Sequence, residues 1–199
     1  MNILLSMDVE ASGPCPNHGD MISFAAIVVE DGLTRHFDSG NMRPECDKFS
    51  EGAYKSIGMT REQHLAAPYT IAERMLAFRD WCEPLLDAEH ARLVENATGR
   101  GENPQGVKRP RVIMLSDNPG FDFQWMNFEC WNKLDSGYLG HSARRIGDAW
   151  AGVKKRPHET MGWKKMRVAP HDHTPLNDAM GNAEAWLEMW RRAKDGAYD

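Results

Sequence analysis

The sequence has few cysteines, no long apolar run and no excess of basic residues. Its four cysteines do not form Cys-x-x-Cys pairs, so they predict free thiols rather than a zinc site or a disulfide framework. No stretch approaches the roughly 20 apolar residues that a membrane-spanning helix needs. The first apolar run is too short for a secretion signal and has no basic segment before it. These absences predict a cytoplasmic protein that does not contact a membrane.

The net charge of the chain is −5 at neutral pH. This balance argues against a protein that coats nucleic acid regardless of sequence, because such binding needs many Lys and Arg contacts to phosphates. It does not argue against a nuclease, since carboxylates that bind divalent cations add negative charge themselves. The apolar fraction of 41% and the seven tryptophans favour a globular fold over a disordered chain.

The apolar pattern predicts strands first and then an alternation of helices and strands. The expected strands cover residues 2–8, 21–29, 33–37 and 111–115. The expected helices cover residues 70–87, 121–133, 142–153 and 177–194, and residues 95–110 read as an exposed loop rich in Gly and Pro. This order indicates an α/β protein with a mixed sheet covered by helices, as a single domain over residues 1–199.

Asp8 and Glu10 follow the first apolar run in the segment Asp-Val-Glu-Ala-Ser-Gly. Residues two apart on a strand point to the same face, so the two carboxylates are expected side by side. Two negative charges at so short a distance repel each other unless a cation lies between them. The segment alone fits an acidic strand end as well as a metal site, because surface acids are common.

Asp122 and Asp178 each stand at the expected start of a later helix. Asp122 ends the segment Asn-Pro-Gly-Phe-Asp after a strand, and Asp178 follows His173 by five residues, with Pro175 between them. A carboxylate in the first turn of a helix is stabilised by the helix dipole even without a function. Each segment taken alone is therefore explained by local structure, and only the combination of all three favours a catalytic site.

In this order the three segments resemble the three motifs of the DEDDh, or DnaQ-like, superfamily of 3′→5′ exonucleases. The matching patterns are Asp-x-Glu after the first strand, Asn-x-x-Phe-Asp after a later strand and His-x-x-x-x-Asp at the start of the last helix. The resemblance spans about residues 3–190. It implies a ribonuclease-H-like fold with a mixed five-stranded sheet flanked by helices. It also implies hydrolysis of 3′-terminal phosphodiesters, with release of nucleoside 5′-monophosphates.

In that superfamily four acids bind two divalent metal ions and a histidine is the general base. The resemblance assigns these roles to Asp8, Glu10, Asp122 and Asp178 as metal ligands and His173 as base. The chemistry is consistent, because Mg²⁺ and Mn²⁺ prefer oxygen ligands and a pair of them activates water and stabilises phosphate charge. An imidazole, with an ordinary pKa of about 6.5, accepts a proton at neutral pH. His171 lies two residues too early to match the motif.

Substrate contacts are assigned by the same likeness and by position. Phe121, next to Asp122, is a candidate for stacking on the terminal base, and the basic stretch 152–170 is a candidate for contacts to phosphates. An ordinary solvated loop with one packed tryptophan is the alternative for that stretch. The predicted contacts are Val9, Ala11, Ser12, Asn118, Phe121, Trp163, Lys164 and Lys165.

The likeness is greatest to a small family of bacterial and phage 3′→5′ exoribonucleases related to a mycobacterial enzyme, which favours the 3′ end of single-stranded RNA as partner. Two alternatives stay open: a DNA 3′→5′ exonuclease of the proofreading or recycling type, and a catalytically silent nucleic-acid-binding module of the same fold. No residue in the sequence can be read as recognising a 2′-hydroxyl. Related exoribonucleases often dimerise, so a homodimer is a further option.

Overall fold

A mixed five-stranded sheet forms the centre of the computed structural model, which describes residues 2–198 and leaves Met1 and Asp199 outside the description. The strand order is β3-β2-β1-β4-β5. β1 pairs antiparallel with β2 and parallel with β4, so it is the central strand. The strands are β1 (Ile3–Ala11), β2 (Met21–Val28), β3 (His36–Asp38), β4 (Val112–Ser116) and β5 (Arg144–Arg145). The sheet expected from the sequence is confirmed.

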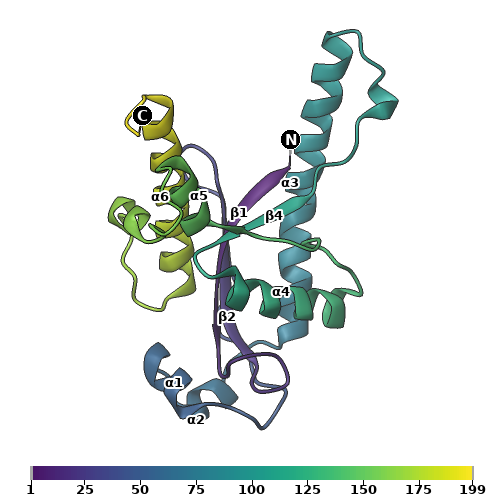
Figure 1. Ribbon diagram of the computed structural model, residues 1–199. Coiled ribbons are helices and arrows are strands. Elements are labelled where there is room, and N and C mark those ends of the chain that lie inside the picture. The colour runs from purple at the N-terminus through teal and green to yellow at the C-terminus, as the bar shows by residue number, and fades with distance from the viewer. Residues whose placement is uncertain (1, 199) are drawn as a thin grey trace.

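Helices cover both faces of the sheet (Figure 1). α3 and α4 lie on one side and α5 and α6 on the other, while α1 and α2 lie beyond one end of the sheet. Among the described residues no helix is both long and apolar enough to cross a membrane. The helices are α1 (Glu51–Ile57), α2 (Arg61–Leu65), α3 (Ile71–Gly99), α4 (Pro119–Leu134), α5 (Ile146–Val153) and α6 (Pro175–Lys194), with short 3-10 turns η1 (Pro104–Gly106) and η2 (Gly162–Met166).

The two faces of β1 differ in chemistry. Met7 and Val9 point into the main core, where they join buried side chains of α3 and α4 such as Phe78 and Trp125. The opposite face of the sheet meets α6 through small residues, among them the fully buried Ala179. Small side chains let the helix approach closely, and the Ser6 hydroxyl donates a hydrogen bond of 2.7 Å to the Ala179 carbonyl. The start of α6 is therefore fixed above the face that carries Asp8 and Glu10.

Several element boundaries differ from those expected. The helix predicted to end at residue 87 continues to Gly99 through Pro84, whose side chain is exposed. A proline on the solvent side of a helix leaves the freed carbonyl accessible to water, which lowers the penalty. α1, α2 and η2 were not expected, because they are too short to show a clear apolar period. The helix predicted over residues 142–153 begins at Ile146, since Arg144 and Arg145 form β5.

The connection between β1 and β2 folds tightly on itself directly after Glu10. The backbone N–H of Ser12 donates to the Asp20 carbonyl at 2.8 Å, and the Asp20 N–H donates to the Ser12 hydroxyl at 2.9 Å. The N–H of Ser50, at the start of α1, donates to the Ser12 carbonyl at 2.7 Å. A Cβ placed on Gly13 would lie 2.0 Å from the carbonyl oxygen of His18. The turn therefore needs glycine at this position.

Gly13→Ala is expected to lower the free energy of unfolding by about 1–3 kcal/mol, because the added methyl group forces backbone atoms apart. Urea denaturation measures the change. Gly99→Ala is the matched control: no atom lies within 4 Å of its added Cβ, and the residue ends α3, where alanine favours helix. If the Gly13→Ala variant were as stable as the wild type, the turn would accommodate a methyl group, contrary to the close contact described above.

Candidate active site

Asp8 and Glu10 lie where β1 extends past the end of β4. The parallel pairing of these strands stops at Ser6 and Leu115, after which the chain leaves β4 and enters α4. Beyond that point this edge of β1 is no longer paired with β4. Open α/β sheets typically bind ligands outside the carboxyl ends of their strands.

Asp122, in the first turn of α4, lies against this unpaired edge of β1. Its side chain is 4% exposed, and its Oδ1 accepts a hydrogen bond of 3.2 Å from the backbone N–H of Val9. The Ser116 hydroxyl donates to the other oxygen. Burial raises the pKa of Asp122 to about 7, although the hydrogen bonds from Ser116 and Val9 act in the opposite direction. The carboxylate therefore fastens the start of α4 to the open edge of β1.

Asp178 approaches from the opposite face, in the first turn of α6, and its side chain is 1% exposed. Its Oδ1 accepts from Arg167 Nη2 at 2.5 Å and lies 2.6 Å from His171 Nδ1. Its Oδ2 accepts from the backbone N–H of His173 at 3.2 Å. Asp122 and Asp178 occupy equivalent places, because each is the fourth residue of a helix that begins with proline. The positive end of each helix dipole thus faces a carboxylate.

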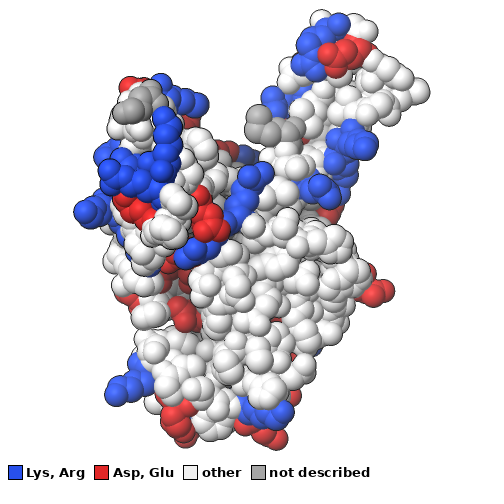
Figure 2. Space-filling view, in the orientation of Figure 1, with Lys and Arg blue, Asp and Glu red and all other residues white. Residues whose placement is uncertain are grey.

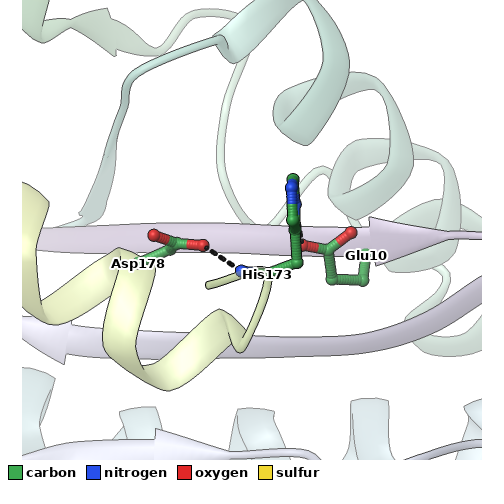
Figure 3. Close-up of side chains that lie close together, drawn as sticks. All are labelled: Glu10, His173 and Asp178. Carbon is green, nitrogen blue, oxygen red and sulfur yellow. Dashed lines mark hydrogen bonds and ion pairs between the residues drawn. The ribbon is translucent and has the colours of Figure 1, made fainter. Parts of the chain in front are cut away.

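His173 stands between the two carboxylates of Glu10 and Asp178 (Figure 3). Its Nδ1 lies 3.4 Å from Glu10 Oε1, and 46% of its side chain is exposed. The backbone of His173 has a φ of +59°, a left-handed conformation that side-chain-bearing residues rarely adopt. Such strain is found where a site imposes it, and here the N–H bond to Asp178 holds the strained loop in place.

Burial, followed by the charges of neighbouring acids, raises the pKa values of Glu10 and Asp8. Burial raises the pKa of Glu10 to about 8, and the charges of Asp178 and Asp122 add to this effect. Burial also raises the pKa of Asp8 well above its usual range, together with the charges of Asp122, Asp178 and Glu10. Arg167 is the one positive group among these causes, and it lowers the pKa of Asp8. A divalent cation would relieve the remaining repulsion.

The donor set fits such a cation. Glu10, His173 and Asp178 each offer one ligand atom, and the three atoms lie within 4.8 Å of one another. Carboxylate oxygens from β1 and α6 converge here, with Asp8 and Asp122 adjoining them through charge interactions. Mg²⁺ and Mn²⁺ favour oxygen-rich sites of this kind over sulfur ligands.

A cavity of about 350 Å³ opens next to this cluster. Glu10 and His173 line its inner side, and Phe121 from α4 lines another. The far wall comes from α1 and the residue before it, through Ser50, Ala53, Ser56 and Ile57. The volume falls in the ordinary range of small-molecule sites, about 300–1,000 Å³. The acidic cluster therefore adjoins a pocket that can hold one ligand unit.

The residues predicted to contact substrate fall into two groups. Ala11 and Phe121 line the cavity, whereas Asn118 is exposed at the start of α4 and Lys165 is exposed on η2. Lys164 forms an ion pair of 2.8 Å with Asp117, which follows β4. These five residues lie on the cavity or on exposed surface of α4 and η2.

The remaining three predicted contacts are buried. The backbone N–H of Val9 is occupied by Asp122, and the Ser12 hydroxyl by Asp20. Trp163 is fully buried and its Nε1–H donates to the Thr160 carbonyl at 3.0 Å. It has no exposed face for a base, which contradicts the substrate contact predicted for it. The structure agrees with the alternative for this stretch, a loop with one packed tryptophan, and the core that buries Trp163 comes from α5 and α6.

Three features of the site were not found by sequence reasoning. These are the Ser116 hydroxyl bonded to Asp122, the wall that α1 contributes to the cavity, and Arg167 bonded to Asp178. Arg167 is one of several basic residues in the stretch 152–170, and a segment without helix or strand separates it from α6, so no periodicity relates it to Asp178. His171, which the motif leaves without a role, also touches Asp178.

Comparison with known proteins gives one similar curated sequence. No protein-family model matches the chain. The 3′-5′ DNA exonuclease Cap18 of Escherichia coli is 23% identical over 192 residues, which cover 92% of this chain and 88% of that protein.

Similar folds occur among solved structures of exonucleases. The nuclease domain of 3′hExo, a DEDDh family member bound to rAMP, has a TM-score of 0.62 at 15% identity, over 98% of this chain and 92% of that chain. E. coli Exonuclease I in complex with a dT13 oligonucleotide has a TM-score of 0.55 at 15% identity, over 99% of this chain and 42% of that chain. The sheet and its flanking helices therefore match the ribonuclease-H-like nuclease fold.

The burial of the acids and their mutual repulsion in the metal-free site predict a stability that falls as pH rises. Glu10 and Asp122 have folded-state pKa values of about 8 and about 7, above the unfolded values near ~4. Between these limits the folded chain binds more protons than the unfolded chain, so the free energy of unfolding decreases with increasing pH.

Asp8→Asn removes one repelling charge and keeps the side-chain volume. In chelator, urea denaturation at about pH 8 should show the variant to be more stable than the wild type, and the difference should shrink at about pH 5. Asp47→Asn, which removes an exposed acid, is the control and should show no such pH-dependent gain. A destabilised Asp8→Asn variant at the higher pH would contradict the repulsion.

Proposed function

We propose that the chain is a 3′→5′ exonuclease of the DEDDh type, which removes nucleotides from the 3′ end of single-stranded nucleic acid with RNA as the favoured substrate; the three motifs, the fold and the similarity to a 3′-5′ DNA exonuclease support this. One observation carries the proposal. Acids from β1, α4 and α6 converge with His173 beside a cavity that can hold one nucleotide unit. The elements come from the beginning, middle and end of the chain, and acids with raised pKa values that meet at one point beside a cavity are typical of a functional site.

The residues divide the chemistry of hydrolysis among them. Two Mg²⁺ or Mn²⁺ ions, held by Asp8, Glu10, Asp122 and Asp178, would supply charge stabilisation and water activation. His173 accepts the proton of the attacking water: its Nδ1 is 3.4 Å from Glu10, so a water held at Glu10 is within reach of the ring. The water oxygen bonds to the phosphorus of the last phosphodiester as the bond from that phosphorus to the 3′-oxygen of the preceding nucleotide breaks. The 3′-oxygen takes up a proton from solvent, which leaves a shortened strand with a 3′-hydroxyl and a free nucleoside 5′-monophosphate.

The cavity beside Glu10 is proposed to hold the terminal nucleoside. Phe121 offers a partly exposed aromatic ring at its wall, which suits stacking on a base of any sequence. The residues of α1 and Ser50 bound the other side of the cavity, opposite Glu10 and His173. A terminal nucleoside in this cavity would place its 5′-phosphate beside the acidic cluster.

The rest of the strand is proposed to run over the basic lobe formed by α5, η2 and the C-terminal half of α6. Figure 2 shows Lys and Arg side chains gathered over this lobe. Lys164, on η2, already holds a carboxylate, that of Asp117 beyond β4, and a phosphate can take the place of such a partner. The local basic surface offsets the negative net charge of the whole chain.

A DNA substrate is the second candidate. The preference for RNA rests on the likeness of the motifs to exoribonucleases, and 3′hExo is described bound to rAMP. The curated relative, in contrast, is named a DNA exonuclease. Near the cavity, the hydroxyl of Ser50 interacts with the N–H of Ala53 and that of Ser56 donates to the Gly52 carbonyl. Both hydroxyls have partners within α1 and its cap, so neither is assigned to the 2′-hydroxyl of a ribose. The relative rates on RNA and DNA decide between the two substrates.

Matched 5′-labelled RNA and DNA oligonucleotides, incubated with the protein and Mn²⁺ or Mg²⁺, test this function. We expect single-nucleotide shortening from the 3′ end, faster on RNA, and no reaction in excess chelator. Asp178→Asn should lower the rate by orders of magnitude while the chain stays folded, because it removes a metal-binding charge but keeps the volume. Undiminished turnover in chelator would refute the metal mechanism, and faster cleavage of DNA would select the second candidate.

The two histidines before α6 can be separated by matched asparagine variants. Asparagine tolerates the left-handed backbone of residue 173, so His173→Asn removes the imidazole without adding strain. If His173 is the base, its loss should lower turnover by roughly 10²- to 10⁴-fold and flatten the rise of rate with pH. His171→Asn should cost far less. Rates measured across pH for both variants decide the matter, and the reverse ranking would assign the base to His171.

A further inference from the structure

Arg167 is a cation with a buried side chain that contacts the acidic cluster through Asp178. It follows η2, and 7% of its side chain is exposed. Its Nη2 donates to Asp178 Oδ1 at 2.5 Å and to the Pro170 carbonyl at 3.2 Å, and its Nη1 donates to Asn182 Oδ1 at 3.1 Å. Asp178 and Asn182 are one helical turn apart on α6, so the planar guanidinium lies along the helix and bonds to both.

Gly181 provides the space for this arrangement. A Cβ at this position would lie 2.6 Å from Nε and 2.9 Å from Cζ of Arg167. The residue has an ordinary helical conformation in the interior of α6, so the backbone does not require glycine there. Glycine weakens a helix relative to alanine. Its place in α6 is therefore accounted for by the guanidinium that covers it.

The two oxygens of Asp178 face different partners. Oδ1 is taken by Arg167 and His171, while Oδ2 receives the N–H of His173. Figure 3 shows one oxygen of Asp178 directed toward His173 and Glu10 and the other directed away from them. A carboxylate that is free to rotate would exchange the positions of these oxygens. The hydrogen bond from Arg167 to Oδ1 holds that oxygen in place.

We propose that Arg167, seated on Gly181, is a positioning residue that orients the Asp178 carboxylate for divalent metal binding. This role rests on the proposed function, because it requires that Asp178 is a metal ligand. Groups that orient a metal ligand commonly change metal affinity by roughly 10- to 100-fold when removed. A cation that competed with the metal for the carboxylates would have the opposite effect. The contact of Arg167 with only the outward oxygen of Asp178 favours positioning over competition.

The test is a calorimetric titration of the full chain with Mn²⁺ in the absence of nucleic acid. The variants are Arg167→Met, Arg167→Lys and Gly181→Ala, with Asp178→Asn as a site control. Arg192→Met is the matched control, because it removes an arginine whose ion pair with Glu188 lies on the exposed side of α6. Melting temperatures identify conditions in which each variant is folded. Gly181→Ala gains helix propensity and keeps the arginine, so any loss of affinity in it cannot come from a weaker helix.

We expect Arg167→Met and Gly181→Ala each to weaken Mn²⁺ binding by roughly 10- to 100-fold. The double variant Arg167→Met/Gly181→Ala should bind Mn²⁺ no more weakly than Arg167→Met alone, because both changes remove the same contact. Arg167→Lys should bind Mn²⁺ little better than Arg167→Met, since a single ammonium group cannot reproduce the planar bonds of the guanidinium to Asp178 and Asn182. Arg192→Met should bind as the wild type does.

Unchanged or tighter Mn²⁺ binding in folded Arg167→Met would overturn the proposal, and tighter binding would mean that the arginine competes with the metal. Unchanged metal affinity with loss of oligonucleotide binding would also overturn it and make Arg167 a substrate contact. A wild-type protein that binds Mn²⁺ no better than Asp178→Asn would refute the metal site itself. Failure of the proposed function is thereby distinguished from failure of the role of Arg167.

Discussion

Repulsion between carboxylates that are shielded from water is the constraint on which the structure around β1 depends. Burial is the largest cause of the raised pKa values of Asp8, Glu10 and Asp122, and the neighbouring acids add to it for the first two. A fold keeps such a cluster only if other contacts offset the cost. Here the offsets are specific: the Ser116 hydroxyl, the Val9 amide, two helix N-termini and the Arg167 guanidinium.

The central strand satisfies two opposite requirements at once. One face of β1 carries Met7 and Val9 into the apolar core, and the other presents Asp8 and Glu10 to α6. The core holds the strand rigid. The carboxylates therefore stay close enough together to bind a metal ion, even though they repel one another. The close approach of α6 depends on small residues such as Ala179. The acidic cluster is thus carried by packing that is otherwise ordinary for an α/β domain.

The candidate site was predictable wherever its geometry is local. The two-residue period of a strand places Asp8 and Glu10 on one face, and a proline three residues before an acid places Asp122 and Asp178 in first helical turns. Long-range packing was not predictable. Trp163 lies in a basic loop but is buried by α5 and α6, and α3 continues through Pro84 because the proline faces solvent. In each case, partners distant in sequence decide the outcome.

The sequence by itself determined the order of the elements, the identities of the acids and the likeness to a nuclease superfamily, because motifs and periods are local properties of the chain. Only the tertiary structure decided how the three segments meet, which oxygens face the cluster, and which basic residue lies against it. Arg167 and Gly181 illustrate the difference: they are 14 positions apart and separated by an irregular segment, so no periodicity relates them, yet they share one contact. Such contacts depend on the packing of η2 against α6, which no local pattern specifies.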